Sequence, residues 1–170
     1  MDMVSAIGWN RGDPMRTQKG FTLTELLMVV AIIGILATIG VPSFRSLILE
    51  NRLTSTANNL LGVMQMARSE AAKLHSTITV CAASPDQSTC VNDANWSAGI
   101  LITQGDDILR VVPLRSAGVT ITSTRPRIDY RGDGKTTAAS FTLNDSRGDD
   151  FERVIQVNAI GQACSGVSCS

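Results

Sequence analysis

Aromatic rings, histidine and net charge are all scarce in this 170-residue chain, and each scarcity excludes a class of function. Aromatic residues make up 4% of the sequence, which leaves few rings for a surface that stacks on nucleic-acid bases. His75 is the one histidine, so a multi-histidine metal centre is excluded. The 15 basic and 15 acidic side chains balance, so no overall charge attracts the chain to nucleic acid or to an acidic membrane surface.

Signatures of catalysis are missing as well. Serine, histidine and aspartate all occur, but no G-x-S-x-G pattern brings them together as it does in hydrolases. We therefore expect no enzymatic activity and no cofactor. Hydrophobic residues make up 44% of the chain, which excludes a disordered protein, and the length suits one domain with an appendage.

A long apolar run near the start of the chain dominates the sequence. From Leu26 to Phe44 there is no charged residue, and a helix of this length can cross a hydrocarbon core of about 30 Å. Arg16 and Lys19 precede the run, and no small-residue cleavage site follows it. We therefore expect a retained membrane helix with a cytoplasmic N-terminus, and export of the rest of the chain.

One acidic residue, Glu25, interrupts the apolar pattern at its beginning. A carboxylate inside a membrane costs several kcal/mol unless it is paired or shallow, which favours a functional role. A glutamate in the first turn of a helix is also favoured by the helix dipole, at the membrane interface. Periodicity alone leaves both interpretations open.

The residues around Glu25 carry a resemblance to a known family. They read Lys19-Gly20-Phe21-Thr22-Leu23-Thr24-Glu25-Leu26-Leu27. This segment closely resembles the class III signal of type IV pilins and type II secretion pseudopilins, in which a short basic leader ends in Gly before Phe and an apolar helix carries Glu at its fifth mature position. Thr24 is a minor departure, because an aliphatic residue is commoner there.

The resemblance implies a processing pathway for this chain. A membrane prepilin peptidase would cut between Gly20 and Phe21 and methylate the new amine of Phe21. Glu25 would then pair with the Phe21 amine of a neighbouring subunit, because a low dielectric makes such a pair strong and its absence costly. Met15 would start a compact leader, so we interpret Met15 as the true start and the residues before it as an extension.

Beyond the apolar run the helical pattern continues, and this gives the division of the chain. Pro42 predicts a kink or local unwinding. After it one apolar stripe recurs at spacings of three and four residues, through Phe44, Leu47, Ile48, Leu53, Ala57, Leu60, Leu61, Met64, Ala67, Ala71 and Leu74. We expect a leader over residues 1–20, a long helix over 21–76 with its membrane-spanning half at about 23–44, and a β-rich periplasmic head over 77–170.

Short β-rich runs separated by turn signals fill that last part. They are TITVCA, AGILIT, ILRVVPL, VTITS, RIDYR, SFTLN and RVIQVNAI. Strands that follow one another without helices favour antiparallel sheets. The expected fold is therefore α+β and pilin-like: a long N-terminal transmembrane and amphipathic helix packed on a C-terminal antiparallel β-sheet head.

The order of elements resembles the H-type pseudopilins and the FimT/FimU-like minor pilins. From it we expect a minor pilin of a type IV pilus that primes assembly or sits at the tip, with prepilin peptidase, the other minor pilins and the major pilin as partners. Before assembly it would lie in inner-membrane lipid with its head in the periplasm, and afterwards in the pilus at the cell surface. An H-type pseudopilin of type II secretion is the alternative.

All four cysteines lie in the part expected to be exported, where disulfides are the default. Local pairing, Cys81 with Cys90 and Cys164 with Cys169, is the simplest of three connectivities. A zinc site is the rival interpretation, but the sequence has no C-x-x-C and little histidine. We predict two disulfides and no metal.

A pilus-associated DNA receptor is the second alternative. Some FimT-like pilins carry a Gly-Arg-x-Arg pattern on the C-terminal strand, and here residues 161–164 read Gly-Gln-Ala-Cys without either arginine. Arg125, Arg127 and Arg131 could still form a local basic patch. Since several uncompensated phosphate contacts are needed for affinity at physiological salt, we expect weak DNA binding.

Overall fold

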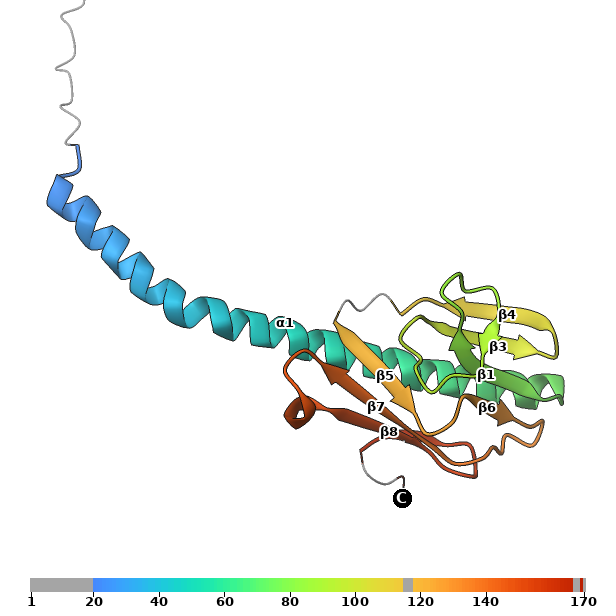
Figure 1. Ribbon diagram of the computed structural model, residues 1–170. Helices are drawn as coiled ribbons and strands as arrows, with labels where there is room; N and C mark the ends of the chain where they lie inside the picture. The colour runs from blue at the N-terminus through green and yellow to red at the C-terminus, as the bar shows by residue number, and fades with distance from the viewer. Residues whose placement is uncertain (1–19, 115–117, 167–168, 170) are drawn as a thin grey trace, which may run out of the picture. The chain divides into compact units, whose positions relative to one another are not determined.

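The structure is a computed structural model that describes residues 20–114, 118–166 and 169 (Figure 1). It contains one long helix, α1 (Leu23–Leu74), and a head of antiparallel strands. Tertiary contacts group the chain into two units that divide between Pro42 and Ser43. The expected leader and start residue, 1–19 with Met15, Arg16 and Lys19, lie outside the described residues.

In the first unit, the described residues present apolar side chains to the surroundings. Residues 20–42 are all exposed, and the most apolar 18-residue window of α1 has a mean hydropathy of 2.4 with none of it buried. The hydroxyl of Thr38 donates a hydrogen bond to the Ile35 carbonyl at 2.7 Å, which satisfies this polar group within the helix. By length and composition, α1 can cross a membrane.

In the second unit, one face of α1 is buried by the head. The buried residues are Leu53, Thr56, Ala57, Leu60, Val63, Met64, Ala67 and Ala71, which confirms the expected spacing of three and four. The stripe is shorter than predicted, because Phe44 and Leu47 are exposed and Leu74 projects from the last turn. Spacing marks an apolar face, but only the sheets determine how much of that face is covered.

The head contains two antiparallel sheets. The first has the order β2-β1-β3-β4, with β6 also paired to β1, and the second has the order β5-β7-β8-β9. The strands are β1 (Ile78–Ala83), β2 (Cys90–Val91), β3 (Ile100–Gln104), β4 (Asp107–Val112), β5 (Val119–Ser123), β6 (Arg127–Tyr130), β7 (Ala139–Asp145), β8 (Arg153–Val157) and β9 (Ala163–Ser165). A short 3-10 helix, η1 (Asp149–Phe151), lies between β7 and β8.

The expected α+β class and its antiparallel pairing are confirmed. All seven β-rich runs in the sequence form strands, namely β1 and β3 to β8. The two strands without a sequence signal, β2 and β9, have two and three residues and each contains a cysteine.

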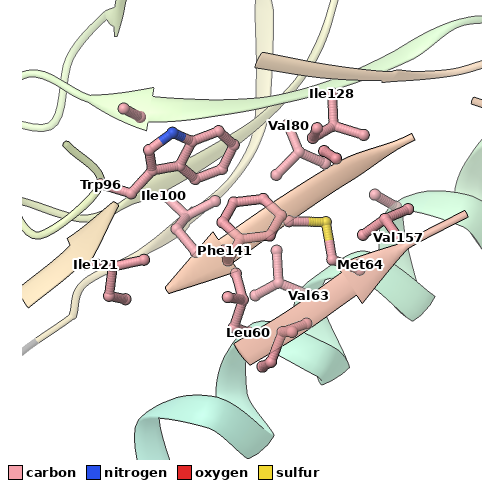
Figure 2. Close-up of a cluster of buried hydrophobic side chains, with 14 of the residues drawn as sticks. Leu60, Val63, Met64, Val80, Trp96, Ile100, Ile121, Ile128, Phe141 and Val157 are labelled. Atoms are coloured by element: carbon pink, nitrogen blue, oxygen red, sulfur yellow. The ribbon is translucent and has the colours of Figure 1, made fainter. Parts of the chain in front are cut away.

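Side chains of both sheets and of α1 meet in one hydrophobic core (Figure 2). Leu60 and Met64 of α1 point towards Phe141 of β7, and the Trp96 ring meets the Phe141 ring edge-on with centroids 5.0 Å apart. Each fully buried side chain of this size contributes about 1.5–3 kcal/mol. This core fixes the second half of α1 to the head.

Candidate assembly site at the start of the helix

The bond expected to be cleaved, Gly20–Phe21, lies just before α1 in non-helical backbone. Both residues are exposed, with 82% of the Phe21 surface accessible. A peptidase needs an accessible, non-helical segment, and the described residues provide one at this bond. Cleavage between Gly20 and Phe21 stays a prediction.

Thr22 caps the helix directly after this bond. Its hydroxyl oxygen accepts a hydrogen bond from the backbone N–H of Glu25 at 3.2 Å, and its carbonyl accepts one from Leu26 at 3.1 Å. Thr22 and Glu25 thus have the spacing of a capping box. This role of Thr22 was not among the expectations, although the Thr-x-x-Glu pattern in the sequence indicates it.

Glu25 lies in the first turn of α1, where the helix dipole favours a carboxylate. Its side chain is exposed, and among the described residues no basic group forms an ion pair with it. Phe21 and Glu25 are four residues apart, so a cleaved Phe21 would bring an amine to the same end of the helix as the carboxylate. The site thus offers one anion and one potential cation beside an apolar helix.

Pro42 is the last residue of the first unit. The helix is assigned without interruption on both sides of it. The expected local unwinding is therefore not seen in the helix assignment, whereas a kink or flexible point at Pro42 stays a prediction.

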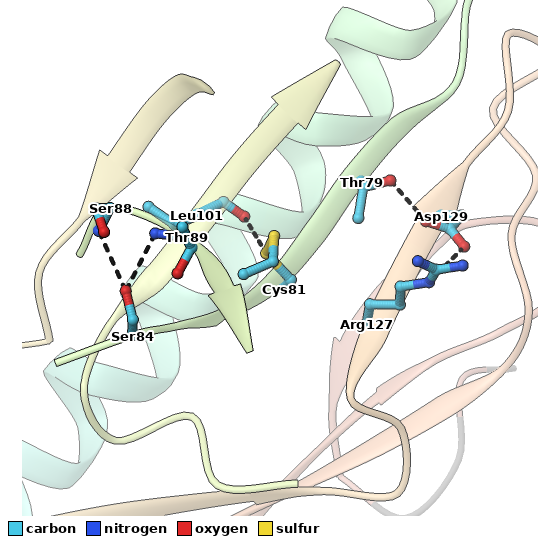
Figure 3. The surroundings of a disulfide bond; sticks show 9 residues. Thr79, Cys81, Ser84, Ser88, Thr89, Leu101, Arg127 and Asp129 are labelled. Carbon is cyan, nitrogen blue, oxygen red and sulfur yellow. Dashed lines mark hydrogen bonds and ion pairs between the residues drawn. A yellow bond between two sulfur atoms is a disulfide. The ribbon is translucent and has the colours of Figure 1, made fainter. Parts of the chain in front are cut away.

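The cysteines form two bonds in the head. Cys81 of β1 is bonded to Cys90 of β2, with their Cα atoms 5.6 Å apart, and Cys164 of β9 is bonded to Cys169, with 5.7 Å between Cα atoms. This is the local pairing proposed from the sequence. Figure 3 shows the surroundings of Cys81, where Ser84 accepts hydrogen bonds from the backbone of Ser88 and Thr89. Within the described residues, no three His, Cys, Asp or Glu side chains are grouped to hold a metal ion.

The arginines considered for DNA binding have local partners. Arg127 lies 3.5 Å from the Asp129 carboxylate (Figure 3), and Arg131 lies 3.5 Å from that of Asp133. Arg125 donates from Nε to the Ala138 carbonyl at 2.9 Å. Neighbouring carboxylates thus neutralise two of the three cations, which weakens the case for a phosphate-binding patch.

A charge cluster that joins α1 to the second sheet was not predicted from the sequence. Arg147 of the β7–β8 connection lies 3.1 Å from Glu50 of α1 and 2.6 Å from the fully buried carboxylate of Asp145. Arg153 pairs with the other oxygen of Glu50. Arg153 and then Arg147 lower the pKa of Glu50, and Arg147 lowers the pKa of Asp145. Glu50 lies about a hundred residues from both arginines in the sequence, so no local pattern could reveal these two contacts.

Comparison with known proteins identifies the family from these features. The family model described as "Type II transport protein GspH" matches residues 56–161, which covers most of the head and the half of α1 that packs on it. The chain belongs to this family. A second model, the prokaryotic N-terminal methylation motif, matches residues 15–41 of this pilin-like GspH protein.

Individual relatives of the GspH-family chain are fimbrial proteins. Fimbrial protein EcpC of Eikenella corrodens is 34% identical over 134 residues, which cover 76% of this chain and 78% of that protein. The type IV major alpha-pilin of Moraxella bovis is 48% identical, but over 46 residues, or 29% of its length. The crystal structure of the type IV minor pilin FimU of Pseudomonas aeruginosa PAO1 superposes with a TM-score of 0.56 at 22% identity, covering 69% of this chain and 90% of that one. The fold is thus that of FimU.

Proposed function

We propose that this chain is a minor pilin that primes type IV pilus assembly or occupies the tip, and is not an enzyme. The observation that carries the proposal is the exposed Gly20–Phe21 bond directly before a Thr22-capped apolar helix with Glu25 in its first turn. The methylation-motif match over residues 15–41 and the fimbrial relatives support it. The head then supplies contacts that distinguish this subunit from the major pilin.

The mechanism follows from the chemistry of the helix start. Prepilin peptidase cuts after Gly20 and methylates the Phe21 amine. A cation at a helix N-terminus is opposed by the dipole, and a carboxylate in lipid is costly without a partner. Glu25 of one subunit and the Phe21 amine of its neighbour satisfy each other, which fixes the register between otherwise featureless apolar helices.

The same features predict where the protein acts. Arg16 and Lys19 precede the apolar segment, so the N-terminus stays cytoplasmic and the head lies in the periplasm. The two disulfides of the head suit that oxidising compartment. The chain is anchored in the inner membrane before assembly and leaves the membrane when it joins the pilus.

The test is substitution of Glu25 in the full chain. For Glu25→Ala or Glu25→Val we expect normal export and cleavage, with strongly reduced amounts in sheared pili. Thr24→Ala is the matched control, because the neighbouring residue lacks a charge. Mass spectrometry should find N-methylated Phe21 as the first residue in all variants. Wild-type amounts of Glu25→Ala in sheared pili would remove Glu25 from this role, and an uncleaved chain would refute the filament proposal.

Membership of the GspH family specifically favours a second candidate, an H-type pseudopilin of type II secretion. It would use the same helix start but support export of folded proteins instead of a surface pilus. Deletion of the gene separates the two. Loss of pili with normal protein secretion supports the minor pilin, whereas loss of secretion with normal pili supports the pseudopilin.

A further inference from the structure

Strand β4 forms an open edge of the first sheet. It pairs with β3 on one side, and no described strand pairs with its other side. Its side chains are unusually exposed for apolar residues, with 43% of Ile108, 43% of Leu109 and 38% of Val111 accessible. An edge of this kind presents unpaired backbone groups and apolar surface to another chain.

A single bulge interrupts the pairing of this edge strand with β3. Ile108 pairs with Thr103 and Arg110 with Ile102, so Leu109 is an extra residue that forms a bulge. Bulges prevent open-ended strand pairing at sheet edges. Any added segment is therefore confined to the short stretch from Arg110 to Val112.

A groove lies between this stretch and α1. It has a volume of about 250 Å³ and is lined by Asn58, Asn59, Gly62, Val63 and Met66 of α1 and by Arg110 and Val112 of β4. A Cβ added at Gly62 would meet no atom within 4 Å, so the glycine leaves open space above the helix. The groove thus has apolar walls and polar amides at its margin.

Arg110 brings a positive charge to this groove. Its Nη1 lies 3.1 Å from the Met66 sulfur, and among the described residues no carboxylate pairs with it. The contrast with Arg127 and Arg131 is clear, since each of those has an aspartate within 3.5 Å. A guanidinium beside apolar surface can donate two hydrogen bonds to a carboxylate from another chain.

We propose that the α1–β4 groove receives an extended acidic segment from the head of a neighbouring pilin-class subunit. The segment runs beside Arg110–Val112, places a carboxylate on Arg110 and covers Met66 and Val112 with an apolar side chain. The inference rests on the proposed function, because it names the neighbour in the filament. Charge complementarity selects this occupant over an uncharged or basic one.

The contact is small, which suits a filament. A three-residue edge and a short groove fall well below the about 1,200 Å² of a stable independent interface. Neighbouring subunits are already held by their helices, so the local concentration of the second head is high and a weak, specific contact is sufficient. The contact at the groove then determines which subunit packs beside this one in the filament.

The test is photo-crosslinking of the full chain in cells that make pili. A benzophenone side chain replaces Asn59 in the groove or, as the control, Gln65 on another face of the same helix. We expect an adduct from position 59, and none from position 65, with a protein other than this chain that mass spectrometry identifies as carrying its own pilin methylation motif. Arg110→Glu should lower the adduct about tenfold, as expected for loss of one charge-assisted contact, and Arg127→Glu should leave it within about twofold.

Several results would overturn the inference. These are no adduct at position 59, equal adducts at both positions, an adduct only with a second copy of this chain, an adduct with a protein lacking the motif, or an adduct that survives Arg110→Glu. The Glu25→Ala variant in the same cells separates the two proposals. If the Glu25→Ala chain is absent from pili, and the chain with native Glu25 enters pili but gives no adduct from position 59, the minor-pilin function stands and the groove assignment fails.

Discussion

At the scale of single residues, two glycines make opposite predictions. Gly161 has a φ of +80°, and a Cβ there would lie 2.0 Å from the Gly134 carbonyl oxygen, whereas Gly62 is helical with open space around it. Gly161→Ala should lower the free energy of unfolding by more than about 2 kcal/mol, because backbone must move. Gly62→Ala should raise it by up to about 1 kcal/mol through helix propensity. Thermal denaturation of the full chain in detergent measures both, and equal effects of the two variants would contradict this reasoning.

The charge cluster of Glu50, Asp145, Arg147 and Arg153 predicts a dependence on acid. The pKa values of Glu50 and Asp145 are lowered in the folded chain from ordinary values of 4.5 and 3.8. Their stabilisation is thus fully present above about pH 5 and is lost as the pH falls through the lowered folded pKa values. The unfolding free energy should be flat near neutral pH and should fall below about pH 4.5.

Two neutral variants test that assignment. Glu50→Gln and Asp145→Asn should unfold at lower temperature than wild type at pH 7, because arginines lose anionic partners. Both should also lose less stability on acidification. Some acid dependence should remain, because Ser84 and then Ser88 lower the pKa of Asp86 to about 2. A wild-type pH profile in both variants would remove the cluster from this role.

At the scale of secondary-structure elements, the two shortest strands depend on disulfides. β2 has two residues and β9 has three, too few to pair stably without help, and each is tied by a cysteine. Closing loops with sequence separations of 9 and 5 contributes about 2.6 and about 2 kcal/mol on the chain-entropy estimate.

Removing each bond as an alanine pair tests this dependence. Cys81→Ala with Cys90→Ala should lower the unfolding free energy slightly more than Cys164→Ala with Cys169→Ala. Amide exchange should increase mainly in β2 for the first pair and in β9 for the second. Protection that persists in both strands would mean that sheet pairing alone maintains them.

The same elements explain how far sequence could predict this fold. Apolar spacings of three and four residues located α1, and β-rich runs between turn residues located seven strands. β2 and β9 could not be predicted, since two and three residues are too few to carry a recognisable pattern. At the helix start Gly20, Phe21 and Glu25 were recognisable and Thr22 was overlooked, whereas the contact of Glu50 with Arg147 exists only once the chain has folded.

At the scale of the whole molecule, assembly and head stability should be separable. The head core consists of residues from Leu53 onward, so Glu25 and Pro42 contribute no side chain to it. In the proposed filament, the apolar first halves of α1 from different subunits pack together, while each head contacts its own neighbouring heads. A flexible point at Pro42 would allow this, because proline removes one helical hydrogen bond.

Pro42→Ala tests that separation. It should leave the unfolding temperature of the head unchanged, while the restored helical hydrogen bond stiffens the chain and lowers its incorporation into pili. Ser43→Ala is the matched control and should alter neither quantity. A shift in head unfolding with Pro42→Ala would mean that the two units are coupled energetically. Unchanged incorporation would instead show that assembly requires the apolar helix and Glu25 without a flexible point between them and the head.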